Sequence, residues 1–381
     1  MSLHYINNKL PIVSHRDIQI VCGNKDVFLS RSLSDYLKKT KEEIDKHQTE
    51  WDHVKKYINP YEFIHTKVPG YRQSVCKYQP ISRSFFKLYE IMDIFSFQEF
   101  LKKTNVTSLH LAEAPGGFVE SLQVFANSNK CKIKKSVGLS LIRTNDTDVP
   151  LWNRNYINSF PNVFIDSGID NCDLTSPENY KHLYAKYSHG FDIITADGGF
   201  DFSSNFNDQE ILSQPLIMSE ILYAITMQNT GGCFVLKIFD CFTKLTAELI
   251  YILCSMYEKV YIYKPNTSRL ANSEKYIVCK NYINTRENRA AFSNIVPDLL
   301  RSLNKISSLL NFELPLVFLN KMEEINAILG QQQLEAISNT ITLINNSAKK
   351  DKLVNLKENN IQKCITWCKK HDFGYTNLSS H

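Results

Sequence analysis

The sequence predicts an α/β fold: a mostly parallel, seven-stranded β-sheet with helices on both faces. Between about residues 107 and 285, short apolar runs alternate with stretches of helical periodicity, which is the pattern of a parallel sheet whose strands are joined by helices. The last two apolar runs lie close together in the chain, which favours one antiparallel edge. Helical patterns on either side of this region predict N- and C-terminal extensions.

Seven apolar runs are the predicted strands. In chain order they cover residues 107–113, 135–141, 162–167, 191–197, 231–239, 259–265 and 274–282. Helices are predicted after the first strand and over residues 32–58, 82–95, 97–103, 176–184 and 207–228, and the pattern beyond about residue 290 is helical to the end. We expect an N-terminal extension (1–81), a central domain (82–288) and a helical C-terminal extension (289–381).

Composition narrows the class of protein. A formal net charge of +5 over 381 residues permits an anionic partner without demonstrating one. The ten cysteines include no C-x-x-C pair, which indicates reduced, intracellular thiols. Cys364, Cys368 and His371 lack a fourth ligand nearby, so no zinc site is expected. Without an apolar signal core or a run of about 20 apolar residues, we expect a soluble protein that is not secreted.

The stretch "HLAEAPGGF", residues 110–118, ends the first predicted strand with an unusual turn. Ligands of open α/β sheets bind beyond the carboxyl ends of the strands, and Gly116 and Gly117 let the backbone approach a ligand or adopt a positive φ. Glu113 adds a carboxylate. The motif is neither G-x-G-x-x-G nor a P-loop, which argues against a dinucleotide or a nucleoside triphosphate. Taken alone, it fits a simple tight turn as well as a ligand site.

Four charged residues interrupt apolar segments. Asp197 ends the strand "FDIITAD", and Lys237 lies in "FVLKIF", where an unpaired ammonium would be costly. Glu274 opens the last strand, and Lys87 interrupts the helix "RSFFKLYEI". Each residue alone fits a surface charge or a structural ion pair, so the hypothesis of a shared site rests on their combination.

Five motifs together resemble a known family. In this order, "SRSFFKLYEI", "AEAPGGF", "ITADGG", "FVLKIF" and "NSEKYIV" are similar to the motifs of the RrmJ-like (FtsJ-type) ribose 2′-O-methyltransferases, over about residues 82 to 285. The resemblance implies a Rossmann-like methyltransferase fold and S-adenosylmethionine as cofactor. It also implies a Lys-Asp-Lys-Glu catalytic tetrad at Lys87, Asp197, Lys237 and Glu274.

The flanking sequences favour one substrate among several. Eukaryotic and viral mRNA cap 2′-O-methyltransferases commonly carry extra sequence on both sides of this core, as this chain does with about 80 and 95 residues. We therefore expect capped mRNA as substrate, association with other capping or transcription proteins, and a location in the cytoplasm, the nucleus or, for a viral protein, the host cytoplasm or virion. The alternatives are methylation of ribosomal or transfer RNA and a catalytically inactive RNA-binding subunit. A dinucleotide-dependent oxidoreductase is disfavoured by the missing glycine motif.

The tetrad suits ribose methylation chemically. A ribose hydroxyl must lose its proton as it attacks the methyl group of a sulfonium, and a neutral lysine can accept that proton, although free lysine has a pKa of about 10.4. We expect Lys237 to be the base, with Lys87 and partial burial lowering its pKa. Asp197 and Glu274 would orient the two lysines. No metal is needed, because the leaving group is already a cation and departs neutral.

The resemblance also assigns binding residues. The turn from Glu113 to Phe118 is expected to cradle the methionine end of the cofactor and Asp173 to hold the adenine edge, while Ser140 or a backbone group replaces an acid for the ribose. The predicted cofactor-binding residues are Glu113, Ala114, Pro115, Gly116, Gly117, Phe118, Ser140, Asp173 and Asp197. The predicted RNA-binding residues are Lys67, Arg72, Lys77 and Arg83, interleaved with Tyr71 and Tyr78 as base-stacking rings. An ordinary exposed loop is the alternative for that segment.

Overall fold

A computed structural model describes residues 2–6, 10–103, 105–142, 150–199, 207–346 and 349–378. The strands are β1 (Ser2–Ile6), β2 (Ile18–Cys22), β3 (Val106–Leu111), β4 (Ile133–Leu139), β5 (Val163–Ile165), β6 (Phe191–Ala196), β7 (Gln228–Ile238), β8 (Tyr257–Lys264), β9 (Lys275–Tyr282) and β10 (Ile306–Leu310). The α-helices are α1 (Arg31–Asp45), α2 (Gln48–Ile58), α3 (Ser84–Ile94), α4 (Phe97–Leu101), α5 (Gly117–Ser128), α6 (Arg154–Ile157), α7 (Pro177–Lys186), α8 (Gln209–Met227), α9 (Lys244–Met256), α10 (Arg286–Ser302), α11 (Leu316–Ile344) and α12 (Lys349–Lys370). Short 3₁₀ turns η1 (His15–Asp17), η2 (Glu62–Ile64) and η3 (Asp170–Cys172) complete the described elements.

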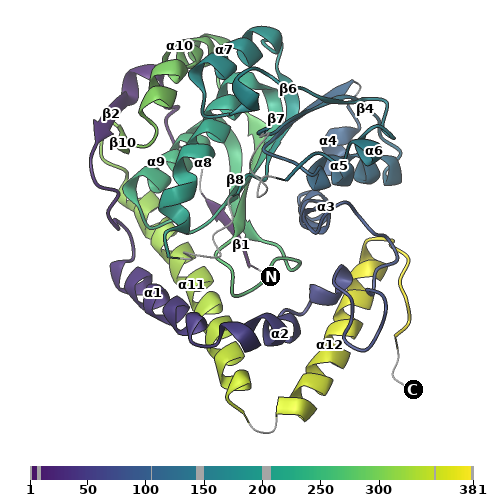
Figure 1. Cartoon of the computed structure of the whole chain (residues 1–381). Coiled ribbons are helices and arrows are strands. Elements are labelled where there is room, and N and C mark those ends of the chain that lie inside the picture. The colour runs from purple at the N-terminus through teal and green to yellow at the C-terminus, as the bar shows by residue number, and fades with distance from the viewer. Residues whose placement is uncertain are drawn as a thin grey trace.

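The centre of the molecule is a sheet of eight described strands in the order β1-β8-β9-β7-β6-β3-β4-β5 (Figure 1). Strands β7, β6, β3, β4 and β5 run parallel to one another, whereas β9 pairs antiparallel with β7 and β8, and β1 pairs antiparallel with β8. A second, two-stranded sheet pairs β2 with β10. The predicted mixed α/β fold and its antiparallel edge are confirmed.

All seven predicted strands are present, as β3 to β9, and β1 is an eighth strand that the sequence did not reveal. It extends the sheet beyond β8, with Ser2 opposite Lys264 and Ile6 opposite Val260. Only its two end residues are buried, so its five residues give no apolar run that would mark a strand. Through β1, the N-terminal extension contributes directly to the central sheet.

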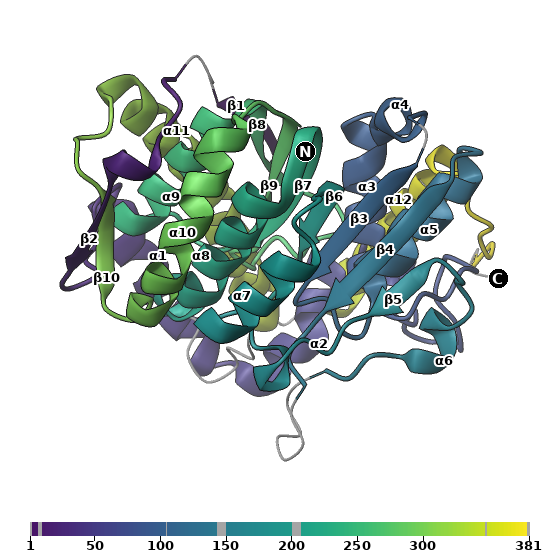
Figure 2. The same ribbon diagram turned by 90° about the horizontal axis from the view of Figure 1, so that it is seen from above.

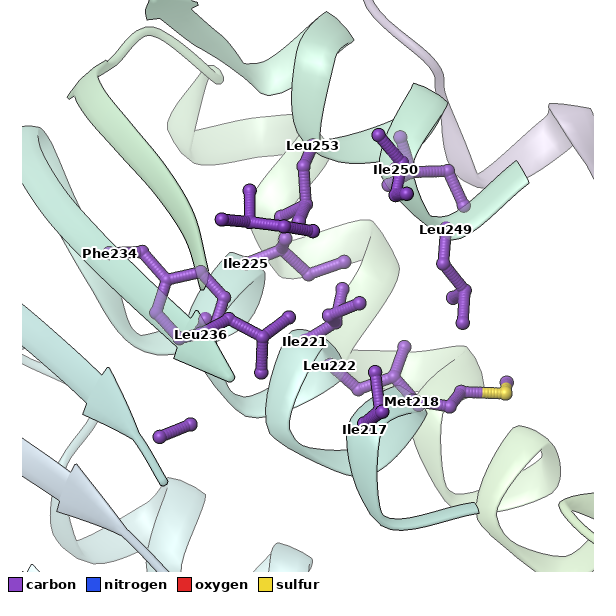
Figure 3. Close-up of a cluster of buried hydrophobic side chains, with 14 of the residues drawn as sticks. Ile217, Met218, Ile221, Leu222, Ile225, Phe234, Leu236, Leu249, Ile250 and Leu253 are labelled. Carbon is purple, nitrogen blue, oxygen red and sulfur yellow. The ribbon is translucent and has the colours of Figure 1, made fainter. Parts of the chain in front are cut away.

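Helices cover both faces of the sheet, as predicted (Figure 2). On one face lie α7, α8, α9 and α10, and on the other α3, α4 and α5. Helix α8 is almost wholly buried and packs against β7 and α9. Its Ile221 and Ile225 belong to the same buried cluster as Phe234 of β7 and Leu253 of α9 (Figure 3). This packing fixes α8 against the strand that carries Lys237.

The terminal extensions pack on one another and on the central domain. Helix α11 contacts both α1 and α2, and α12 contacts α2 and η2 (Figure 1). Among the described helices, none has the length and apolar character needed to cross a lipid bilayer.

Two predicted helical segments differ in the structure. The single helix expected over residues 32–58 is broken into α1 and α2, because the chain turns where the His47 amide bonds the Ile44 carbonyl at 2.9 Å. Because of this turn, α1 and α2 each pack separately against α11. The helical pattern expected after residue 290 is interrupted by β10, whose Ser308 hydroxyl and Leu309 amide bond the buried Glu248 carboxylate of α9. Pairing with β2 and with this carboxylate replaces the local helical hydrogen bonds.

Candidate active site

The carboxyl ends of three neighbouring strands meet at one edge of the sheet. Ala196 of β6 lies opposite both Leu111 of β3 and Leu236 of β7. The residues that follow these positions therefore share that edge, and they include Glu113, Asp197 and Lys237. Strand β9 is antiparallel to β7 and begins opposite its end, with Lys275 paired to Ile238. Glu274, one residue earlier, is brought to the same edge.

Helix α3 supplies the fourth member of the tetrad. The Lys87 ammonium lies 2.7 Å from Oε1 and 2.8 Å from Oε2 of Glu274. The hydroxyl of Ser268 donates to the same carboxylate at 2.7 Å. Lys87 thus ties α3 to the start of β9.

Lys237 and Asp197 form the second pair. The Lys237 ammonium donates to the Asp197 backbone carbonyl at 2.7 Å and lies 3.4 Å from its Oδ1 atom. The buried Tyr276 hydroxyl donates to that Oδ1 at 3.1 Å. The structure therefore brings all four predicted tetrad residues together as two ion pairs, each side chain at least 86% buried.

The charges of the site favour the ionised forms of Glu274 and Lys237. Burial opposes ionisation of Glu274, but Lys87 and Lys237 outweigh it and hold the pKa of that carboxyl well below its ordinary value. Burial likewise disfavours the Lys237 ammonium, yet Asp197, Glu274 and the buried Glu220 of α8 together hold the pKa of Lys237 above its ordinary value. This direction is opposite to the lowered pKa predicted from sequence, because three carboxylates face Lys237 while the charge of Lys87 is balanced by Glu274.

A buried carboxylate on α3 holds the loop that precedes Glu274. Glu90 accepts hydrogen bonds from the amides of Asn266 at 2.9 Å and Thr267 at 3.1 Å, and from the Thr267 hydroxyl at 3.0 Å. The Tyr263 hydroxyl also donates to it, at 2.6 Å. The sequence reasoning missed Glu90, although an acid inside the apolar helix "FFKLYEIMDIF" was the available signal.

A second buried carboxylate, from η2 of the N-terminal extension, holds the same loop. Glu62 is fully buried and lies 2.6 Å from Nη1 of Arg83 and 2.7 Å from Nη2 of Arg269. Burial opposes its ionisation, but the two guanidinium groups outweigh it and lower its pKa to about 2. Arg83 also donates to the Thr267 carbonyl at 2.9 Å. Arg83, predicted to contact RNA, is therefore engaged in this internal ion pair and is not free for a phosphate while the pair holds.

The two glycines of the Pro-Gly-Gly turn have different structural roles. Gly116 has a φ of 117° and caps the start of α5, a conformation that favours glycine. A Cβ on Gly117 would come within 2.1 Å of the Ser82 hydroxyl oxygen and 2.2 Å of that of Ser84. Gly117 thus lets α5 pack directly against the start of α3, the helix that carries Lys87. The turn that presents backbone amides also positions a tetrad residue.

The predicted cofactor residues border this turn. Glu113 is buried and accepts from the Thr195 hydroxyl at 2.9 Å, and burial together with Asp197 raises the pKa of this carboxyl well above its ordinary value. Ser140 lies beside the turn, its hydroxyl oxygen 3.4 Å from the Ala114 amide. The ring of Phe118 is buried in the core, 6.0 Å from that of Tyr276, so Phe118 can face the turn only with its backbone.

Asp173 and a missed tryptophan lie around the end of β4. The Ile142 amide bonds the Asn171 carbonyl at 2.7 Å, which brings η3 and the adjoining Asp173 to this strand end. The ring of Trp152 lies so close to Gly138 that an added Cβ would approach it to 2.7 Å. Trp152 also borders a hollow of about 470 Å³ beside β4, and its buried indole nitrogen has no hydrogen-bond acceptor among the described residues. The glycine at position 138 of an otherwise apolar strand was the sequence signal for this contact.

The predicted RNA segment carries exposed basic side chains and is fixed to the rest of the molecule at residues 77 and 78. The side chains of Lys67, Arg72 and Lys77 are exposed. The amide of Lys77 donates to the Gly374 carbonyl at 2.9 Å, which ties the segment to the C-terminal end of the chain. Tyr78 differs from the prediction, because its hydroxyl bonds Glu120 at 2.8 Å and its ring stacks on Phe85. That ring is part of the packing and is not a free stacking surface.

Comparison with known proteins identifies a family and individual proteins whose sequences are similar to this chain. The sequence profile of the FtsJ-like methyltransferases matches residues 80–282. A "Cap-specific mRNA (nucleoside-2'-O-)-methyltransferase 1" of Mus musculus is 31% identical over 277 residues, which are 70% of this chain and 32% of the mouse protein. The corresponding protein of Trypanosoma brucei brucei is 32% identical over 217 residues, 53% of this chain and 55% of its own. This chain thus spans about a third to a half of the length of these curated relatives.

Two further comparisons extend this result. A "Cap-specific mRNA (nucleoside-2'-O-)-methyltransferase 2" of Mus musculus is 28% identical over 324 residues, 81% of this chain and 39% of the mouse protein. A solved structure named as a ribosomal RNA methyltransferase of Plasmodium falciparum covers 54% of this chain and 99% of its own, at 24% identity and a TM-score of 0.39. That structural likeness is too loose to support an argument about the site.

Proposed function

Because the chain belongs to the FtsJ-like methyltransferase family, we propose that it transfers a methyl group from S-adenosylmethionine to a ribose 2′-hydroxyl of RNA near a 5′ cap. The observation that carries this proposal is the pairing of Lys87 with Glu274 and of Lys237 with Asp197 at one strand edge. The glycine turn at Gly116 follows β3, the strand next to β6 in the sheet. A base, its orienting groups and a ligand-binding turn are thus within reach of one reacting ribose.

The residues around the turn fit the proposed cofactor. The first backbone amides of α5 attract an anionic group such as a carboxylate, and Glu113 and Ser140 offer polar atoms beside them. The hollow next to Trp152, with its unbonded indole N–H, suits the flat adenosine part. When bound, S-adenosylmethionine supplies the methyl group on a sulfonium, whose positive charge opposes protonation of a nearby amine.

Lys237 is the proposed proton acceptor. Its amine lies at the strand edge, fixed by Asp197, and the positive charge of Lys87 is already balanced by Glu274. The three carboxylates that favour its ammonium form must be offset before it can accept a proton. Lys87, on the facing helix α3, is proposed to steady the ribose hydroxyl. General-base assistance of this kind typically contributes about 10² to 10⁴-fold.

Capped mRNA is the substrate that we propose, with other capping or transcription proteins as partners. The relatives named above are called cap-specific, and Glu62 of the N-terminal extension holds the loop that leads to Glu274. Residues 1–81 are proposed as an RNA-contacting extension, 82–288 as the methyltransferase domain and 289–381 as a supporting helical extension. Lys67, Arg72 and Lys77 are the proposed phosphate contacts, because their side chains are exposed.

Methyl transfer from labelled S-adenosylmethionine to matched RNAs tests the proposal. We expect label on capped RNA, much less on the uncapped RNA of the same sequence, and none on capped RNA whose 5′-terminal riboses are already 2′-O-methylated. Nuclease mapping should place the label near the cap. Equal rates on capped and uncapped RNA would favour a structured-RNA substrate, and cofactor binding without transfer to any RNA would favour an inactive RNA-binding subunit.

A further inference from the structure

Glu220 is a buried carboxyl that the proposed mechanism leaves without a role. It lies on α8 with no exposed surface, in the apolar stretch of that helix shown in Figure 3. Among the described residues, no donor meets the ordinary geometric limits of a hydrogen bond to its oxygens, although the backbone amide of Gly198 lies close enough to lower its pKa. A buried carboxylate with only this weak backbone donor is energetically costly, so its presence between Ser219 and Ile221 calls for an explanation.

The carboxyl of Glu220 is directed at the turn formed by Gly198 and Gly199, which follows Asp197. A Cβ placed on Gly198 would come within 2.3 Å of Oε1 of Glu220, so this carboxyl lies directly against the backbone of Gly198. A Cβ on the next residue, Gly199, would lie 3.0 Å from the Lys237 nitrogen. Both glycines directly follow Asp197. One short turn therefore separates Glu220 from Lys237.

Glu220 and Lys237 influence each other electrostatically. Burial raises the pKa of Glu220 to about 8, an effect that Lys237 opposes and Asp197 reinforces. In turn, burial disfavours the Lys237 ammonium, and Asp197, Glu274 and Glu220 favour it. Glu113, at the end of β3, is the further ionisable neighbour that interacts with both Glu220 and Lys237. Of these four carboxyls, Glu220 is the one without a hydrogen-bonding side-chain partner in the described structure.

We propose that Glu220 regulates the charge of Lys237. While the Glu220 carboxyl is protonated and neutral, Lys237 can lose its own proton, whereas an ionised Glu220 retains the proton on Lys237. Glu220 is thus a positioning residue that acts through Lys237 without touching the RNA. The inference deepens the proposed function and rests on it, since a neutral Lys237 is there the acceptor of the ribose proton.

The proposal predicts a distinctive dependence on pH. At pH values below the pKa of Glu220, the neutral fraction of Lys237 grows about tenfold per pH unit. Above it, the next proton is lost from Glu220, so the neutral fraction of Lys237 levels off. In Glu220→Gln, which keeps the shape but not the charge, the neutral fraction continues to rise with pH.

The titration of Lys237 in the full-length protein is the decisive measurement, because it does not depend on methyl transfer. Lysine labelled with ¹³C at Cε reports the ionisation of each amine by NMR, and the signal missing from Lys237→Arg identifies Lys237. In Glu220→Gln we expect the midpoint of Lys237 to fall by about one pH unit or more. An unchanged midpoint would overturn the inference and leave the proposed function untouched.

Glu210→Gln is the matched control on the same helix. Glu210 is also buried, but its carboxylate accepts from the backbone amides of Phe242 and Thr243, and the charged group that acts on it is Asp240. Its neutralisation should leave the Lys237 midpoint in place. If Glu210→Gln moves that midpoint as far as Glu220→Gln does, the effect is not specific and the inference is wrong.

Single-turnover methylation supplies a second readout. One pH unit above the pKa of Glu220, the Glu220→Gln variant should methylate RNA faster than wild type by up to about tenfold. At pH values below that pKa, the two rates should converge. A purely structural role for Glu220 would instead lower the rate by the same factor at every pH, and that result would contradict the inference.

Discussion

The Lys237 ammonium donates a hydrogen bond to the Asp197 carbonyl at 2.7 Å and lies 3.4 Å from the carboxylate of the same residue. Backbone and side chain of one aspartate therefore fix the amine, and Tyr276 fixes that aspartate in turn. The arrangement gives Lys237 a single position at the strand edge. It also favours the ammonium form of Lys237 in the protein without cofactor and RNA. The proposed reaction therefore depends on a lowering of the pKa of Lys237 when cofactor and RNA bind.

The Glu62 ion pairs are expected to stabilise both the fold and the site. In Glu62→Gln the guanidinium groups of Arg83 and Arg269 lose their buried anion, and the loop leading to Glu274 loses an anchor. Breaking a fully buried pair costs roughly 3–5 kcal/mol, and we expect less here because Arg269 is 38% exposed. Thermal unfolding measures the loss. Asp52→Asn, which removes an exposed pair with Lys55, should leave the melting temperature nearly unchanged.

The contribution of Glu62 should also depend on pH. Because its pKa is lowered from 4.5 to about 2 in the folded protein, its stabilisation is fully present above about pH 4.5 and is lost as the pH falls toward 2. The difference in unfolding free energy between wild type and Glu62→Gln should shrink over that range. A difference that stays constant from pH 6 to pH 2 would show that folding does not lower the pKa of Glu62.

Gly117→Ala tests the contact between the glycine turn and the lysine helix. Its methyl group would overlap the hydroxyls of Ser82 and Ser84 and crowd the Phe85 amide at 3.2 Å, so the start of α3 must adjust to it. We expect a loss of about 1–3 kcal/mol in stability, as for other overpacked sites, together with a large loss of methyl transfer. Gly374→Ala, whose Cβ would meet only ordinary contacts at 3.6 Å, is the control. Unchanged stability and activity in Gly117→Ala would refute this account of the turn.

Much of the fold and the tetrad was predictable because the signals are local. Each strand from β3 to β9 contains a short apolar run, and the tetrad residues stand out as charges within or beside apolar segments. What the sequence concealed depends on contacts between distant segments. Glu62 and Arg269 are 207 residues apart, and nothing in either neighbourhood specifies the other. The direction of the Lys237 pKa was mispredicted because Asp197 and Glu274 together outweigh burial, and Glu220, which reaches Lys237 only through tertiary packing, adds to them.

The exposed basic segment should contribute electrostatically to RNA binding. Replacing Lys67, Arg72 or Lys77 by alanine should weaken binding to capped and uncapped RNA alike and reduce the slope of log affinity against log salt by about 0.7 for each phosphate that the variant no longer neutralises. Cofactor affinity should not change. Lys130→Ala, an exposed lysine at the far end of α5, is the matched control. An RNA affinity and salt slope equal to those of wild type in all three variants would place the RNA elsewhere.

Single-turnover methylation of capped RNA by Lys237→Arg, followed across pH, tests the central claim most directly. Arginine keeps the positive charge and the reach to Asp197, but its guanidinium remains protonated and cannot accept the ribose proton. If Lys237 is the base, the variant should bind S-adenosylmethionine with nearly the affinity of wild type and lose methyl transfer by about 100-fold or more at every pH. A near-native rate in Lys237→Arg would contradict the account, because the site would then need only a cation at this position and not a proton acceptor.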